Sequence, residues 1–227
     1  TGGIHVDPTM LTSDADIYAA GDCVESVDLI TGQPCYVPLG STANKQGRVA
    51  AVNIAGGKSR FPGVLGTTVC RVFDYCVART GLSEQEARQR GYDVVTVSAL
   101  DLHKRRAPYS NFGAKVDVAA PGGDMGVDDN GDGYGDGVLS PMADDSGDLF
   151  YEFYDGTSMA SPHVAGVVAL MKSVNPGLTP LDLDRLLAGT HSGTSIRIVE
   201  DLGDPGRDEI YGFGFIDALG AVRAAQE

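Results

Sequence analysis

Ser158 is the residue whose surroundings most clearly indicate covalent chemistry. It lies in the segment GTSMASPHVAG, residues 156–166, where a Gly turn precedes a run of small residues. The first backbone N–H groups of a helix have no carbonyl partner within it, and they can stabilise the oxyanion that forms when a serine attacks an acyl carbon. The sequence therefore predicts a serine nucleophile at the start of a helix over about residues 158–174.

The same segment resembles the nucleophile segment of the subtilase family of serine endopeptidases. Residues 106–124 and 211–225 resemble two further parts of that family, the strand and turn ahead of the nucleophile and the closing helix. The resemblance implies that residues 93–227 form the C-terminal half of a subtilase, a partial α/β domain with a parallel sheet. It also implies hydrolysis of a peptide or protein substrate, with Ser158 as the nucleophile.

The other members of a catalytic triad have no counterpart in the sequence. A serine hydroxyl needs a histidine to take its proton and a carboxylate to orient that histidine. None of the four histidines is followed by the Gly-Thr of the subtilase histidine: His5, His103, His163 and His191. Asp145-Ser146-Gly147 has the letters of the aspartate signature, but no apolar strand precedes it. Since losing a triad partner costs a subtilisin about 10⁴ to 10⁶ in turnover, the chain is expected to be nearly inert alone.

The first part of the chain has a different pattern. Residues 17–22, IYAAGD, predict an apolar strand that runs into a Gly-Asp turn, and residues 38–57, PLGSTANKQGRVAAVNIAGG, contain a predicted helix. Together they resemble flavin-dependent pyridine nucleotide-disulfide oxidoreductases of the NADH oxidase and coenzyme A disulfide reductase type. This resemblance implies that Asp22 bonds the ribityl chain of FAD. It also implies that residues 64–94 begin a dimerisation domain, through which a homodimer could form.

Residues 1–92 are therefore expected to be a partial FAD-binding and dimerisation fragment, which meets residues 93–227 at a buried strand near residues 93–100. The GxGxxG turn that holds a dinucleotide phosphate is absent from the sequence. Three hypotheses follow: a subtilase endopeptidase, a fragment of an FAD-dependent NAD(P)H or disulfide oxidoreductase, or a non-catalytic chimeric product. Peptide-bond hydrolysis is the main prediction, because the Ser158 motif is longer and more specific than the Gly-Asp turn.

The charge balance is acidic and limits the expected partners. The sequence has 17 Lys and Arg against 31 Asp and Glu, a formal net charge of −14. No Lys or Arg occurs between Lys115 and Lys172, whereas Asp is frequent there. Such a surface should repel nucleic acid and anionic membranes, so neither is an expected partner.

A Gly-rich segment within this stretch has the spacing of a calcium-binding loop. The letters DDNGDGYGDG place oxygen-bearing side chains at positions 1, 3, 5 and 9 of an EF-hand-like loop, at Asp128, Asn130, Asp132 and Asp136. Position 12 is Leu139 rather than the bidentate Glu of an EF-hand, so a further ligand is required from elsewhere. The spacing predicts a stabilising calcium ion, and a solvated acidic loop without an ion is the alternative.

Local signals predict three further helices. Ser83 and Glu86 have the spacing of a capping box, and Thr179 followed by Pro180 is a typical helix start. A last helix is expected after Asp217, in a core-packing role.

Overall fold

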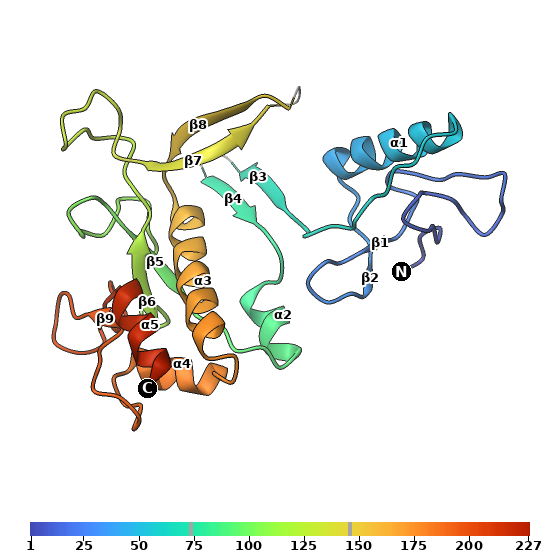
Figure 1. The fold of residues 1–227 in the computed structure, drawn as a ribbon. Coiled ribbons are helices and arrows are strands. Elements are labelled where there is room, and N and C mark those ends of the chain that lie inside the picture. Colours follow the sequence, from blue (N-terminus) through green and yellow to red (C-terminus); the bar gives the residue numbers. More distant parts are fainter. Residues whose placement is uncertain (73–74, 145–146) are drawn as a thin grey trace. The chain divides into compact units, whose positions relative to one another are not determined.

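The computed structural model describes residues 1–72, 75–144 and 147–227, without the side chains of residues 68–78. The chain divides into two compact units, Thr1–Tyr92 and Asp93–Glu227 (Figure 1). Each unit has its own hydrophobic cluster. Within these ranges no helix is both long and apolar enough to cross a membrane.

Unit 1 is organised around helix α1 (Gly40–Ile54). The Gln46 side chain of this helix is buried, and both of its polar atoms are hydrogen-bonded. Its Oε1 accepts from the Gly21 N–H at 2.9 Å, and its Nε2 donates to the Ser26 hydroxyl at 3.0 Å. Buried amides that keep their hydrogen bonds fix the segments they join. The small core beside it consists of Met10, Val49, Ala50, Phe61 and Val64.

The rest of unit 1 consists of short elements. They are β1 (Ser26–Val27) and β2 (Pro34–Cys35), which pair antiparallel, the antiparallel pair β3 (Thr68–Val72) and β4 (Tyr75–Arg79), and helix α2 (Glu84–Gln89). The predicted capping box at α2 is confirmed. The Ser83 hydroxyl accepts from the Glu86 N–H, and the Glu86 carboxylate accepts from the Ser83 N–H.

The predicted strand over residues 17–22 is wrong. The segment makes only an isolated bridge between Leu11 and Tyr18, and Ile17 is exposed. A strand needs neighbouring strands to pair with, and none of the sheets in the described part of unit 1 includes this segment. The turn after it is present, with Gly21 at φ +88°.

Unit 2 has the predicted α/β architecture with parallel strands. Its sheet has the order β5 (Val97–Leu100), β6 (Val118–Pro121), β10 (Phe215–Ile216) and β9 (Val199–Glu200). The pairs β5–β6 and β6–β10 are parallel, and β10–β9 is antiparallel. Strands β5 and β6 carry small buried residues, among them Ala99, Ala119 and Ala120, so a helix can pack closely on them.

Helix α3 (Thr157–Val174) packs on β5 and β6 and against α5 (Ala218–Gln226). The predicted helix over residues 158–174 is thus confirmed. Its buried residues recur every three or four positions, the period of one helix face: Ala160, Val164, Val167 and Met171. The other side is uncovered by the described residues of unit 2, and Leu170 there is 52% exposed.

The ends of the remaining helices follow their predicted caps. At α4 (Pro180–Leu187) the Thr179 hydroxyl accepts from the Asp182 N–H, and the Asp182 carboxylate accepts from the Thr179 N–H. At α5 the Asp217 carboxylate accepts from the Leu219 N–H. Both caps satisfy N–H groups that have no partner inside their helix.

An antiparallel hairpin, β7 (Val138–Ala143) and β8 (Leu149–Tyr154), leads into α3 and was not predicted. One face of it is apolar along its whole length, with Leu149 85% and Tyr151 73% exposed. That face combines the cross-strand pairs Leu139 with Phe153, Pro141 with Tyr151, and Ala143 with Leu149. Asp145 and Ser146, part of the aspartate-like signature, lie outside the described residues.

We expect Met171→Ala to lower the free energy of unfolding by about 2 to 5 kcal/mol, because it removes a fully buried side chain and leaves a cavity. Its neighbour Leu170 is the matched control. Leu170→Ala should change the free energy of unfolding by less than about 0.5 kcal/mol, because the Leu170 side chain is largely exposed and its removal leaves no cavity. Urea denaturation followed by circular dichroism measures both, and equal effects would contradict the one-sided packing of α3.

Candidate active site

The turn ahead of Ser158 has a backbone conformation that favours glycine. Gly156 has φ +146° and ψ +158°, which side-chain-bearing residues rarely adopt. Its N–H is shared between the carbonyl oxygen of Gly122, at 3.0 Å, and the hydroxyl of Tyr109, at 2.9 Å. Its own carbonyl accepts from the Met159 N–H at 2.9 Å. These bonds fix the direction in which the first turn of α3 begins.

Gly122, directly after β6, is the residue that lets this turn approach the sheet. A Cβ atom at Gly122 would overlap the Cβ of Ala99 on β5 and lie 2.8 Å from the Tyr109 hydroxyl oxygen. It would also lie 3.1 Å from the Gly156 carbonyl oxygen. A glycine at each side of the contact therefore allows the backbone of the turn to lie against the end of the strand.

The Tyr109 hydroxyl connects this contact to the loop that follows it. It donates to the Gly123 carbonyl at 2.7 Å and accepts from the Gly156 N–H at 2.9 Å. Burial raises the pKa of Tyr109 to about 12, and the carboxylates of Asp155 and Asp124 act in the same direction, whereas the Gly156 N–H opposes them. The hydroxyl is therefore protonated at neutral pH and can keep both bonds.

Ser158 lies on the exposed side of the first turn of α3. Within the described residues, neither its hydroxyl nor its N–H makes a hydrogen bond. An exposed hydroxyl beside an unused N–H can attack a carbonyl carbon and stabilise the resulting oxyanion from the same residue. The predicted nucleophile thus lies at the start of a helix, with a donor beside it.

The four histidines bind other groups. His163 is exposed on α3 and its Nδ1 lies 2.8 Å from the Met159 carbonyl oxygen, which is a local helix contact rather than core packing. In unit 2, His103 pairs with Asp129 at 3.2 Å, and His191 lies 3.8 Å from Asp182. His5 pairs with Glu25 in unit 1. No hydrogen bond within the described chain joins a histidine to the Ser158 hydroxyl.

The predicted flavin-site residue, Asp22, is exposed at the turn after Gly21. A pocket of about 260 Å³ in unit 1 lies at the first turns of α1, where Ser41, Thr42 and Lys45 contribute to its lining. Asp22 is not part of that lining. The structure therefore does not bring Asp22 to the pocket at the start of α1, and FAD binding through Asp22 stays a prediction.

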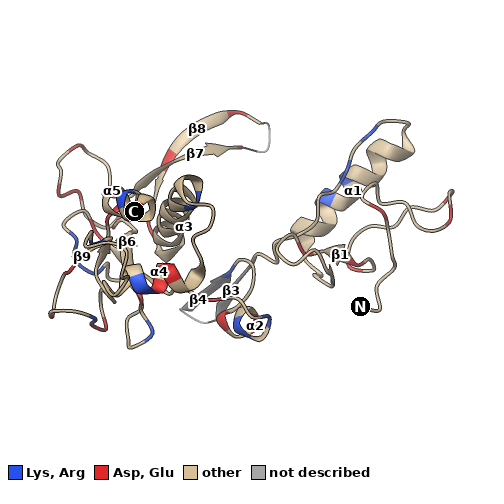
Figure 2. Ribbon diagram, turned by 60° about the horizontal axis from the view of Figure 1, so that its bottom comes forward, with Lys and Arg blue, Asp and Glu red and all other residues tan. Residues whose placement is uncertain are grey.

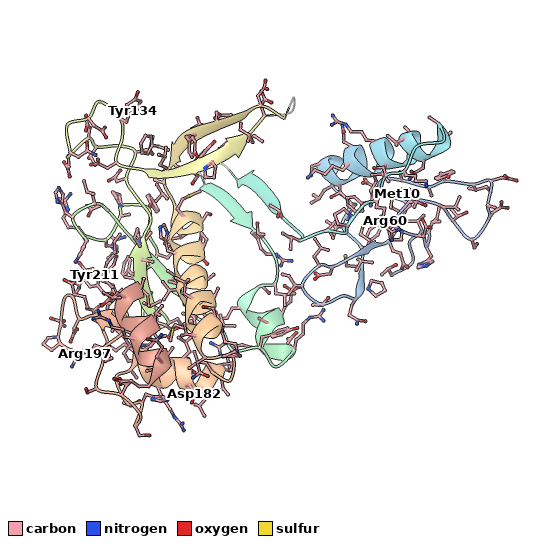
Figure 3. The ribbon with its side chains drawn as sticks, viewed as in Figure 1. Met10, Arg60, Tyr134, Asp182, Arg197 and Tyr211 are labelled. Atoms are coloured by element: carbon pink, nitrogen blue, oxygen red, sulfur yellow. The ribbon has the colours of Figure 1, made fainter. Side chains whose placement is uncertain are left out.

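In the predicted calcium loop, side-chain oxygens accept hydrogen bonds from backbone N–H groups of the loop itself. The Asp128 carboxylate accepts from the N–H groups of Gly131, Asp132 and Gly133 at 2.8 to 3.1 Å. Asn130 accepts in the same way from the Asp132 N–H at 2.8 Å. Figure 3 labels Tyr134 on this loop, and Figure 2 shows red acidic segments in the loops of unit 2.

Asp136 differs from the other three predicted ligands because it is buried, at 7% exposure, whereas Asp128, Asn130 and Asp132 are exposed. The described residues contain no group of three or more His, Cys, Asp or Glu side chains placed to hold a metal. The predicted ligands thus do not gather around one point, and calcium binding stays a prediction.

The family model described as Subtilase family (Peptidase_S8) matches residues 40–214, which is more than half of the chain. The chain belongs to the subtilase family. The matched range includes Tyr109, Gly122, Gly156 and Ser158, and it extends into unit 1. The resemblance predicted from the segment around Ser158 is confirmed.

Known proteins that are similar to this chain include members of both predicted classes, proteases and oxidoreductases. The chain is 44% identical over 99 residues to "Extracellular protease" of Xanthomonas campestris pv. campestris, covering 43% of this chain and 15% of that protein. It is 49% identical over 96 residues to "NAD(P)H sulfur oxidoreductase (CoA-dependent)" of Pyrococcus abyssi, covering 42% of this chain and 22% of that protein. This subtilase chain therefore spans about a fifth of the length of such relatives and combines similarity to two enzyme classes.

A solved oxidoreductase structure is also similar to this chain. It is a FAD-dependent pyridine nucleotide-disulphide oxidoreductase from Desulfovibrio vulgaris, 46% identical, covering 43% of this chain and 24% of that chain with a TM-score of 0.41.

We expect Tyr109 to contribute stability that is complete below pH 10 and is lost between pH 10 and 12. Its folded pKa, about 12, lies above the ordinary value of 10.0, so folding favours the protonated form. Tyr109→Phe should remove this part of the pH dependence of the unfolding free energy. In a spectrophotometric titration of the folded protein it should also remove the rise in phenolate absorbance near pH 12. Tyr151→Phe is the control, because Tyr151 is 73% exposed whereas Tyr109 is 39% exposed. An unchanged profile in Tyr109→Phe would contradict the role of burial.

Proposed function

We propose that this subtilase chain carries the nucleophile half of a serine endopeptidase. The observation that supports the proposal most directly is the position of Ser158, exposed at the start of α3 with its hydroxyl and N–H both unused within the described residues. The protease relatives support the same class of reaction.

In the proposed reaction the Ser158 Oγ attacks the carbonyl carbon of a peptide bond. The new C–O bond forms as the carbonyl electron pair moves to oxygen, where the Ser158 N–H donates a hydrogen bond to the oxyanion. The serine proton passes to a histidine, which later gives it to the leaving amine as the C–N bond breaks. Water then hydrolyses the acyl-serine ester and restores the hydroxyl.

This chain supplies the serine and its N–H, while its own histidines bind other groups. We infer that the histidine and aspartate belong to a polypeptide segment other than residues 1–227. The bonds of Gly156 to Gly122 and Tyr109 would then hold Ser158 in a fixed position for that segment. Holding the reacting groups in a fixed geometry contributes a large part of an enzyme's rate acceleration, because small displacements of these groups lower the rate strongly.

Labelling with a fluorophosphonate probe tests the role of Ser158. We expect slow covalent labelling of the wild-type chain at Ser158, none in Ser158→Ala, and unchanged labelling in Ser161→Ala, which changes an exposed serine of the same helix. Peptide turnover by the chain should be at least about 10⁴-fold below that of a complete subtilase, since the triad partners are missing. Mass spectrometry locates the label, and equal labelling of Ser158→Ala would exclude Ser158 as the nucleophile.

FAD binding is the second candidate, proposed for unit 1. The oxidoreductase relatives support it, and Asp22 is the residue that the sequence assigns to the flavin. Homodimer formation through residues 64–94 belongs to the same proposal.

Calcium binding by the Asp128 loop stays a separate proposal, with a direct test. An ion that binds only the folded chain raises its melting temperature, so the proposal expects a rise in calcium chloride that Asp128→Asn abolishes. Differential scanning calorimetry measures this rise. A melting temperature that calcium leaves unchanged would contradict the proposal.

A further inference from the structure

The carboxyl group of Asp136 is buried and only partly satisfied. Its Oδ2 accepts from the Asp129 N–H at 2.7 Å, whereas its Oδ1 is buried and has no hydrogen-bond partner within the described residues. The backbone of Asp136 is held on both sides: its N–H donates to the Val127 carbonyl, and its carbonyl accepts from the Asp124 N–H, each at 2.9 Å. The carboxyl group is therefore fixed in place, with one buried oxygen that has no hydrogen-bond partner within the described residues.

Asp136 lines a pocket of about 140 Å³ in unit 2. Most of the side chains around it are apolar, from Leu100, Leu102, Pro121, Val138 and Phe153. Asp101 and Asn130 complete its polar lining. A cavity near 150 Å³ holds a benzene-sized group, so this pocket has room for one side chain.

The cations beside this pocket are paired with carboxylates other than Asp136. Arg105 Nε donates to Asp101 Oδ2 at 2.7 Å, and Arg105 Nη2 donates to Asp129 at 3.0 Å. His103 also lies against Asp129. Asp136 has no ion pair with a Lys, Arg or His of the described chain, so its charge has no cation to match it.

The pocket shares its framework with the nucleophile turn. Gly123 lines the pocket, and its carbonyl accepts from the Tyr109 hydroxyl, which also binds the Gly156 N–H. Phe153 lines the pocket from β8, the strand that leads directly into the turn before Ser158.

We propose that this pocket binds the side chain of a lysine or arginine from a peptide. A buried carboxylate oxygen without a partner favours a cation that donates a hydrogen bond to it, and apolar walls favour a hydrocarbon stem behind that cation. A calcium ion needs six to eight oxygen ligands, which mostly apolar walls do not provide. The proposal concerns binding alone, so it can hold even if Ser158 is not a nucleophile.

A titration followed by protein NMR tests the proposal, with Nα-acetyl-lysinamide as the probe and the neutral Nα-acetyl-norleucinamide as its matched control. We expect saturable shifts at Gly137 and Phe153 with the lysine probe and at least about tenfold weaker binding of the norleucine probe. Asp136→Asn should weaken lysine binding by a similar factor. Asp148→Asn, which removes an exposed charge outside the pocket, should not.

Two further variants keep the test decisive if Asp136→Asn does not fold. Leu102→Lys places a cation at the pocket wall and should abolish probe binding, whereas Leu102→Met should keep it. Equal binding of the two probes, no binding of either, or full binding to Leu102→Lys would overturn the proposal. So would binding of calcium chloride that depends on Asp136 in a chain that does not bind the lysine probe.

Discussion

The backbone contact between Gly156 and Gly122 is the constraint on which the active-site side of unit 2 depends. It joins the end of β6 to the first turn of α3, and the Tyr109 hydroxyl adds the loop after β6 to the same contact. A Cβ on Gly122 would not fit, and the φ of Gly156 disfavours any residue with a side chain. The position of the first turn of α3, on which Ser158 lies, therefore depends on the packing of two glycines.

Local signals were enough to predict the helices and their caps. Ser83, Thr179 and Asp217 act on N–H groups within three residues, so their roles depend on short sequence spacing alone. The strand over residues 17–22 failed for the opposite reason, since a strand exists only where other segments pair with it. The hairpin β7–β8 was missed because its two strands pair across a Gly- and Asp-rich stretch, and that composition does not predict strands.

The sequence predicted the part of the candidate site that lies in one continuous segment and missed the part that distant segments form together. Ser158 could be found because its segment is a continuous motif. Tyr109 carried no such signal, because its role appears only when three segments distant in sequence meet at its hydroxyl. The spacing of the acidic loop grouped Asp136 with Asp128, although folding buries the first and leaves the second exposed.

The apolar face of the β7–β8 hairpin bears on how the chain behaves in solution. Leu149 and Tyr151 present uncovered hydrocarbon surface, and a two-stranded sheet has edges to which other strands can add. At low ionic strength the net charge of −14 keeps copies of the chain apart by mutual repulsion. Salt shortens the range of that repulsion to about 10 Å at 0.1 M, so the colloidal stability of the protein should decline as ionic strength rises.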